Sequence, residues 1–239
     1  MKESGSNRAQ RRRGVLQRIA VFLPWRVLAW LRKNSPQVFQ FLCYGTRNVN
    51  DREHWDAAWE RHGKDGFRAT GEVRELRERV LQAVSPRATV LDVGCGAGET
   101  MALLRDNKGC VCSGLDIAPS AVAAVITKGM QAKVATLPEI PYEDDAFDAV
   151  VCTETLEHVS DARAVLREIR RVLKPMGVLV LSVPDGAVDL EDAHVHRFSS
   201  GRLRGLVQKE FTLQHMERIH CESPSLLVIA QRSVDRQPR

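Results

Sequence analysis

The ten residues from Thr89 to Gly98 constrain the fold of this chain more than any other segment; they read TVLDVGCGAG. β-Branched and aliphatic residues that end in glycines are typical of a buried strand running into a tight turn. Glycines at alternate positions let the backbone adopt conformations closed to other residues, and they let a ligand come close. In an open α/β sheet such a turn lies at the carboxyl end of a strand, where nucleotides bind. The segment therefore predicts an α/β fold with a site of this kind.

The glycine spacing and the preceding acid, Asp92, narrow the choice of ligand. A dinucleotide fingerprint has the spacing G-x-G-x-x-G, with the pyrophosphate on a helix N-terminus. Here Gly94, Gly96 and Gly98 give G-x-G-x-G. The Asp92 carboxylate would repel a pyrophosphate, but it can hold a cationic amine. A glycine turn without a ligand is the alternative, so the surrounding segments decide.

The turn resembles the first motif of the class I S-adenosylmethionine-dependent methyltransferases. Their methyl donor carries an amino-acid moiety and a sulfonium, with no phosphate. Asp116 ends a second predicted strand, 24 residues after Asp92. In open α/β folds an acid about 20 residues after the glycine turn binds the ribose hydroxyls. We therefore expect Asp92, Asp116 and the adjacent Ile117 in a donor site, together with the three glycines.

Two later segments resemble the same family. Residues Val134–Tyr142 resemble the segment that ends the third strand and lies against adenine, with Thr136 where many members have Asp and Leu137 as apolar cover. Residues Ala146–Val159 resemble the family's "FD-x-V…LEH" stretch and are close to the ubiquinone-biosynthesis O-methyltransferases and their relatives. The resemblance implies that Thr153 touches the donor.

The remaining elements follow the order of a seven-stranded methyltransferase sheet. We expect a three-layer, Rossmann-like α/β domain over residues 50–239, preceded by a basic tail and an amphipathic helical extension over residues 1–49. Lys174–Gly177 is expected to stop a helix, because proline and glycine follow the last periodic residue. The predicted helices are Glu72–Val84, Arg163–Leu173 and Phe198–Lys209, with Ser199 as an N-cap, and the later strands are Gly177–Pro184, Phe211–Ile219 and Ser225–Arg232.

The basic charge of the chain is concentrated near its beginning. The 239 residues carry a net charge of +5, but residues 1–33 hold nine basic residues and a single acid, Glu3. The rest of the chain is therefore net negative. A domain built to bind nucleic acid would usually carry the positive charge itself, so nucleic acid is not the expected partner.

Residues 14–33 are dense in apolar residues and flanked by arginines. Their longest apolar run, Ile19–Trp25, has seven residues, whereas a transmembrane helix needs about 20. The segment could lie on a membrane surface, pack as a helical cap over the donor cleft, or serve as an organellar presequence. The first reading implies peripheral membrane contact, a small-molecule or lipid-linked substrate, and a cytoplasmic location at the inner face of a membrane.

Trp55 and Trp59 are four residues apart, which places both on one face of a helix. Similar tryptophan-rich helices in the resembled family cover the donor or the substrate. Simple packing onto the sheet is the alternative.

Methyl transfer from a sulfonium is an in-line displacement that depends on proximity and orientation. A hydroxyl acceptor also needs a base or a metal to remove its proton. The candidate catalytic bases are His158, expected to start the helix after the fourth strand, and His196, with His194 as a third. These histidines could instead cap helices or orient loops.

A metal site is not expected. Glu191, Asp192, His194 and His196 offer oxygen and nitrogen ligands, but the cluster is local and nothing else in the sequence supports it.

The sequence thus predicts an enzyme that transfers a methyl group from S-adenosylmethionine to a hydroxyl oxygen of a small or lipid-linked acceptor. The alternative is an RNA or protein methyltransferase guided by the basic N-terminal segment. A non-enzymatic relative of the fold is a third hypothesis, against which the intact glycine turn and Asp116 argue. Methyltransferases of nucleic-acid amines often carry an Asn/Asp-Pro-Pro-aromatic turn where this chain has Thr153–Leu156, which weakens the nucleic-acid reading.

Overall fold

The computed structural model describes residues 24, 26–27, 30–31, 50–62, 72–189, 194–219 and 224–233. Seven strands form one sheet in the order β3-β2-β1-β4-β5-β7-β6. Strands β1 to β5 run parallel to one another, whereas β7 runs antiparallel to both β5 and β6. The strands are β1 Thr89–Val93, β2 Val111–Asp116, β3 Gln131–Val134, β4 Phe147–Thr153, β5 Leu173–Pro184, β6 Thr212–Ile219 and β7 Ser225–Gln231.

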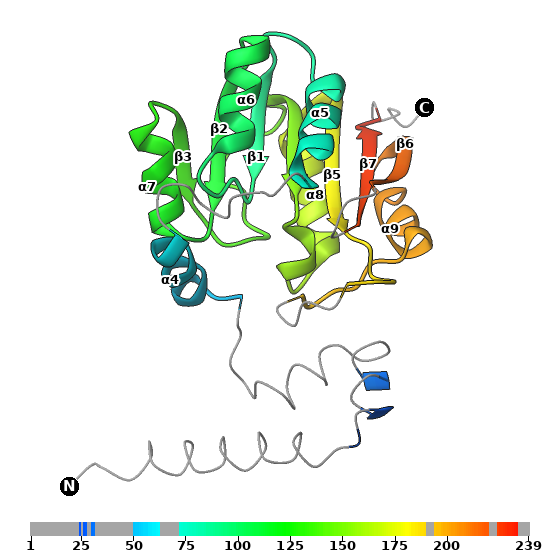
Figure 1. Cartoon of the computed structure of the whole chain (residues 1–239). Helices are drawn as coiled ribbons and strands as arrows, with labels where there is room; N and C mark the ends of the chain where they lie inside the picture. Colours follow the sequence, from blue (N-terminus) through cyan, green and yellow to red (C-terminus); the bar gives the residue numbers. More distant parts are fainter. Residues whose placement is uncertain are drawn as a thin grey trace, which may run out of the picture.

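Helices cover both faces of this sheet (Figure 1). Apolar residues of α5 and α6 pack on one face, and those of α8 and α9 pack on the other. Within residues 50–233, as far as the structure describes them, the helices are α4 Arg52–His62, α5 Glu72–Ala83, α6 Glu99–Lys108, α7 Pro119–Thr127, α8 Ala162–Val172 and α9 Ser200–Val207, and Leu156–His158 forms the 3-10 turn η2.

The strand sequences are apolar because both sides of the sheet are buried. In β1, Val90 belongs to the cluster formed with α5 and α6, whereas Leu91 and Val93 belong to the cluster formed with α8 and α9. All three are fully buried. The predicted three-layer α/β fold with a seven-stranded sheet is confirmed.

The parallel strands end at one edge of the sheet, which gathers the loops that follow them. Figure 1 shows α4 and the loop after β5 at this carboxyl edge. Val93 pairs with Leu115 near the ends of β1 and β2, and Thr153 pairs with Ser182 near the ends of β4 and β5. Residues that follow these strands therefore meet in space.

Two local predictions were wrong. Helix α8 ends at Val172 and β5 begins at the next residue, so Lys174–Gly177 lies inside a strand and does not form a stop. Because β5 has extra residues there, the register with β4 shifts between Phe147 and Ala149, and Met176 adopts a φ of +66°. His158 does not start a helix either: it ends the turn η2, and α8 begins at Ala162 behind the Asp161 cap.

Little of the N-terminal segment is described. Its described apolar side chains include Val27 and Trp30, which are 40% and 59% exposed. Across the described residues, no helix combines the length and the apolar character that crossing a membrane requires.

Candidate functional site

The glycine turn after β1 has the geometry that its sequence predicts. Gly94 and Gly96 have φ values of +74° and +50°, which side chains disfavour. The amide of Gly94 donates to the carbonyl of Leu115 over 2.7 Å, which ties the turn to β2. A Cβ on Gly96 would lie 2.5 Å from the Trp59 ring. The turn therefore needs glycine at both positions, for its backbone conformation and for the close approach of Trp59.

Two buried carboxylates, Asp92 and Asp116, lie beside this turn. Asp116 accepts hydrogen bonds from the amides of Gly96 and Ala118, each over 2.9 Å and each at a different oxygen. Burial raises the pKa of Asp116 above its usual value. Burial, with a smaller contribution from the Asp116 charge, raises the pKa of Asp92 to about 7. Two acids this close and this buried form a site that favours a cation.

The loop after β3 continues beside Asp116. The amide of Ala135 donates to the Asp116 carbonyl over 2.9 Å. Thr136, next in the chain, is exposed, whereas Leu137 is half-buried against the main apolar cluster. The structure thus brings the predicted donor residues of β1, β2 and this loop to one edge of the sheet.

Thr155 connects β1 with β4, and sequence reasoning did not single it out. Its hydroxyl lies 2.9 Å from the Thr153 carbonyl and 3.3 Å from the Val93 carbonyl. A Cβ on Gly94 would collide with this side chain. Thr153, a predicted donor contact, is half-buried at the end of β4. Thr155 therefore packs the two strand ends together.

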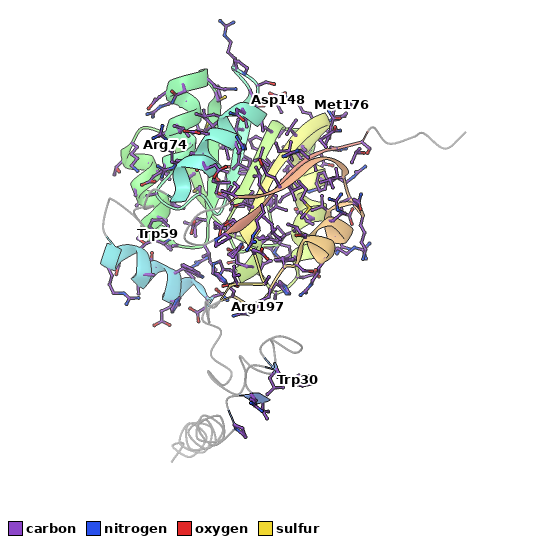
Figure 2. The ribbon with its side chains drawn as sticks, turned by 45° about the vertical axis from the view of Figure 1, so that its right-hand side comes forward. Trp30, Trp59, Arg74, Asp148, Met176 and Arg197 are labelled. Atoms are coloured by element: carbon purple, nitrogen blue, oxygen red, sulfur yellow. The ribbon has the colours of Figure 1, made fainter. Side chains whose placement is uncertain are left out.

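Helix α4 covers the glycine turn from the other side. The Trp59 ring lies against Gly96, and Figure 2 shows this side chain on the side of α4 that faces the sheet. The Asp56 carboxylate accepts from the Ser120 amide over 2.7 Å, at the first turn of α7. Hydrogen bonding to Ser120 lowers the pKa of Asp56. The four-residue spacing of Trp55 and Trp59 predicted that both lie on one face of a helix, but it did not predict the contact between Asp56 and Ser120.

A pair of histidines lies where β4 and β5 end. The rings of His158 and His194 are 4.8 Å apart, and Trp55 lies 4.8 Å from the His158 ring. His158 Nδ1 is 3.0 Å from Asn50 Oδ1, and His194 Nδ1 is 2.8 Å from Asp189 Oδ2. Because both partner atoms are oxygens that accept hydrogen bonds, Nδ1 is the donor in each of these contacts.

Glu157 lies beneath this pair without a hydrogen bond to either carboxylate oxygen. Its side chain is 1% exposed, and its Oε1 lies 3.8 Å from His158 Nε2. Burial, and then the charge of Glu154, raise the pKa of Glu157 well above its usual value. Unpaired buried carboxylates are costly, so this arrangement favours a bound cation or proton.

His196, predicted as a second catalytic base, lies elsewhere. Its ring is 93% buried, 5.7 Å from the Phe198 ring. Burial, followed by the charge of Arg202, lowers its pKa. The histidine that the structure brings to His158 is His194, and a bend at Val195 separates it from His196.

A family model described as a methyltransferase domain matches residues 65–222. The chain belongs to this methyltransferase family.

Relatives of this methyltransferase domain agree with the match. A ubiquinone biosynthesis O-methyltransferase of Xanthomonas oryzae pv. oryzae (strain PXO99A) is 40% identical over 105 residues, which make up 40% of this chain. The match spans only 42% of that relative's length.

Solved structures share the fold. The Burkholderia thailandensis 1,6-didemethyltoxoflavin-N1-methyltransferase, solved with 1,6-didemethyltoxoflavin and S-adenosylhomocysteine, is 18% identical with a TM-score of 0.65; the comparison covers 77% of this chain and 87% of that one. An S-adenosylmethionine-dependent methyltransferase from Methanosarcina mazei is 21% identical with a TM-score of 0.57, over 66% of this chain and 98% of that one.

The predicted methyltransferase family is confirmed. The residues of this domain also fit the predicted donor, S-adenosylmethionine. Its ammonium group suits the buried Asp92 carboxylate, and its ribose suits the second lone pairs of Asp116.

The methyltransferase domain also contains a group of side chains that could hold a metal ion. One ligand atom each from Glu157, His158 and His194 lies within 4.8 Å of the others. The group considered in the sequence analysis was different. Of its members, Glu191 and Asp192 lie outside the described residues, and His196 does not belong to the group found in the structure. Only His194 is common to both.

Proposed function

We propose that this methyltransferase domain transfers a methyl group to a hydroxyl oxygen of a small or lipid-linked acceptor. The observation that carries the proposal is the histidine pair, His158 and His194, which lies after the ends of β4 and β5, at the sheet edge where the predicted donor residues also gather. The donor, when bound, supplies an electrophilic methyl group on a sulfonium. The Xanthomonas relative, named as an O-methyltransferase of ubiquinone biosynthesis, supports oxygen as the accepting atom.

On the donor side, each predicted residue has a separate task. Asp92 would bind the ammonium group, and Asp116 with Ile117 would bind the ribose. Leu137 would cover the adenine and Thr136 would offer it a hydroxyl, while Thr153 would border the methyl group. Trp59 lies against the glycine turn, so it would keep water away from the bound donor.

On the acceptor side, His158 is the best-placed base. The hydrogen bond from Nδ1 to Asn50 leaves Nε2 able to accept the hydroxyl proton. Trp55 packs edge-on against the ring and fixes its plane. Asp189 orients His194 in the same way, so Asn50 and Asp189 are positioning residues.

His158→Ala tests this assignment. We expect the methyl-transfer rate on hydroxyl acceptors to fall about 100-fold or more, the range that loss of a general base produces, while donor affinity stays unchanged. His215→Ala is the matched control, because His215 is 54% exposed on β6. A His158→Ala enzyme with an unchanged rate, measured with a labelled methyl donor, would refute the role of His158.

The buried, unpaired Glu157 favours a second way to activate the hydroxyl. A divalent cation held by Glu157, His158 and His194 would lower the pKa of a bound hydroxyl directly. Asn50 and Asp189 would then be the outer partners that orient the two histidine ligands. Dialysis against a chelator separates the routes: loss of turnover that Mg²⁺ or Zn²⁺ restores supports the cation, and retained turnover supports histidine alone.

We also propose that residues 14–33 contact the inner face of a membrane and so bring the domain to a lipid-linked acceptor. Deleting residues 2–33 tests this against the RNA or protein alternative. Lost binding to anionic vesicles, with retained turnover on soluble acceptors, supports the membrane role. Lost RNA binding with a steep salt dependence would support the alternative.

A further inference from the structure

A cavity of about 440 Å³ lies between α8 and α9, separate from the donor site and from the histidine pair. Ser160 and Asp161 border it before α8, and residues of α9 form the opposite wall. Its volume falls within the range of sites for small molecules.

The lining is strongly cationic. Arg163, Arg202 and Lys209 contribute positive charges, whereas Asp161 is the only acid. The Asp161 carboxylate already accepts from the Ala164 amide over 2.9 Å, and Arg163 has a distant partner in Glu210 at 3.5 Å. The cavity therefore has an excess of positive charge.

Arg202 is held in place without a carboxylate. Its guanidinium donates to the Arg197 carbonyl over 3.2 Å and lies 5.4 Å from the centre of the Phe198 ring. Among the described residues, no acid pairs with Arg202 or with Lys209. Arg202 is exposed, and a guanidinium without a carboxylate partner is suited to an oxyanion, because its remaining donors match that geometry.

His196 also lines the cavity and is 93% buried. Its ring nitrogens are closed off from solvent and lie near the backbone of Val159 and Ser160, so the imidazole packs in the wall of the cavity.

The rest of the lining consists of apolar side chains and two glycines. Phe198 and Leu206 line the cavity, and a Cβ on Gly201 or on Gly205 would meet no atom within 4 Å. The wall formed by α9 thus leaves room for a bulky group beside the cations.

We propose that this cavity binds a phosphate-type anion carried on an apolar body, with Arg202 and Lys209 on the oxyanion and Leu206 against the apolar part. The site is distinct from the methyl-transfer centre. The segment 194–198 connects the two sites, because the amides of Val195 and His196 both donate to the Glu157 carbonyl.

Titration of the full chain with phenyl phosphate, inorganic phosphate and phenol tests the proposal. We expect saturable binding of phenyl phosphate, weaker binding of inorganic phosphate and none of phenol. Inorganic phosphate binding as tightly as phenyl phosphate would overturn the apolar part of the proposal. Saturable binding of neither anion would overturn it entirely.

Matched variants locate the site. Arg202→Glu should weaken phenyl phosphate binding at least tenfold. Arg204→Glu makes the same charge change at another exposed position of α9 that does not line the cavity, and it should leave binding unchanged. Gly205→Leu should block binding by filling the cavity while preserving the melting temperature and donor affinity. Equal losses in the two arginine variants, or unchanged binding in Gly205→Leu, would show that the anion binds elsewhere.

Discussion

The buried Asp92 differs in its chemistry from an ordinary surface acid. Its carboxylate is 3% exposed at the end of β1, close to Asp116. Charging it without a cationic partner costs free energy, because burial in a low-dielectric site disfavours the ionised form. A donor with an ammonium group removes that cost, so binding and ionisation should be linked.

Asp92→Asn should therefore change both stability and affinity. The folded-state pKa of Asp92 is about 7, above its usual 3.8, so the native state holds a proton that the unfolded chain gives up. Stability without donor should fall as pH rises from about 4 to 7 and then level off. In the Asp92→Asn variant, the melting temperature should therefore differ much less between pH 5 and pH 8 than in the unaltered protein.

The same variant should weaken donor binding at pH 8 at least tenfold, because the ammonium group loses its charged partner. In the unaltered enzyme, affinity should rise between pH 6 and pH 8 as Asp92 ionises. Calorimetric titration measures both effects. An Asp92→Asn protein that binds the donor as tightly as before would remove Asp92 from the site.

At the scale of elements, α4 joins parts of the site that are far apart in the sequence. It places Trp59 on the glycine turn, Trp55 on His158 and Asp56 at the start of α7. Helix α7 starts after Ala118, which cannot cap it with a side chain. Asp56 therefore supplies the capping oxygen from another helix.

Asp56→Ala should destabilise the domain by about 0.5–2 kcal/mol, the usual cost of losing an N-cap. Because the cap also fixes α4, the variant should show weaker donor binding, which chemical denaturation and donor titration would measure together. Glu60→Ala on the exposed side of α4 is the control and should change neither value. A loss of stability with unchanged donor affinity would limit Asp56 to a structural role.

Across the whole molecule, the edge of the sheet at the amino ends of the parallel strands differs in its role from the edge at their carboxyl ends. In Figure 2, Asp148 and Met176 lie at the end opposite to Trp59 and Arg197. At that amino edge, Asp148 accepts from the Thr89 amide over 2.8 Å and pairs with Lys174 at 2.7 Å, which joins β1, β4 and β5. The carboxyl edge carries the predicted site.

Asp148→Asn should lower stability without affecting catalysis. Hydrogen bonds from Lys174 and Thr89 lower the pKa of Asp148 to about 2. The stabilisation is therefore complete above about pH 4 and is lost as pH falls through about 2. We expect a loss of about 1 kcal/mol or less at pH 7, since the side chain is 42% exposed and solvent screens the pair.

Denaturation at pH 7 and pH 3, alongside methyl-transfer rates, measures this effect. A reduced rate at unchanged stability would place Asp148 in the functional machinery instead of in the framework.

The sequence alone determined the sheet and the donor edge. Continuous apolar runs, the glycine turn and the 24-residue interval from Asp92 to Asp116 are local signals, because strand burial and turn conformation depend on neighbouring residues. The predicted N-cap at Ser199 is confirmed for the same reason, since its hydroxyl accepts from the Arg202 amide over 3.3 Å. The start of β5 was missed because its register depends on pairing with β4.

Only the tertiary structure decided which polar side chains meet. The choice of His194 over His196 beside His158, the partners Asn50 and Asp189, and the cap from Asp56 depend on contacts between segments up to 108 residues apart. No local pattern encodes such contacts, because they arise only when the sheet brings its strand ends together and α4 folds back across them.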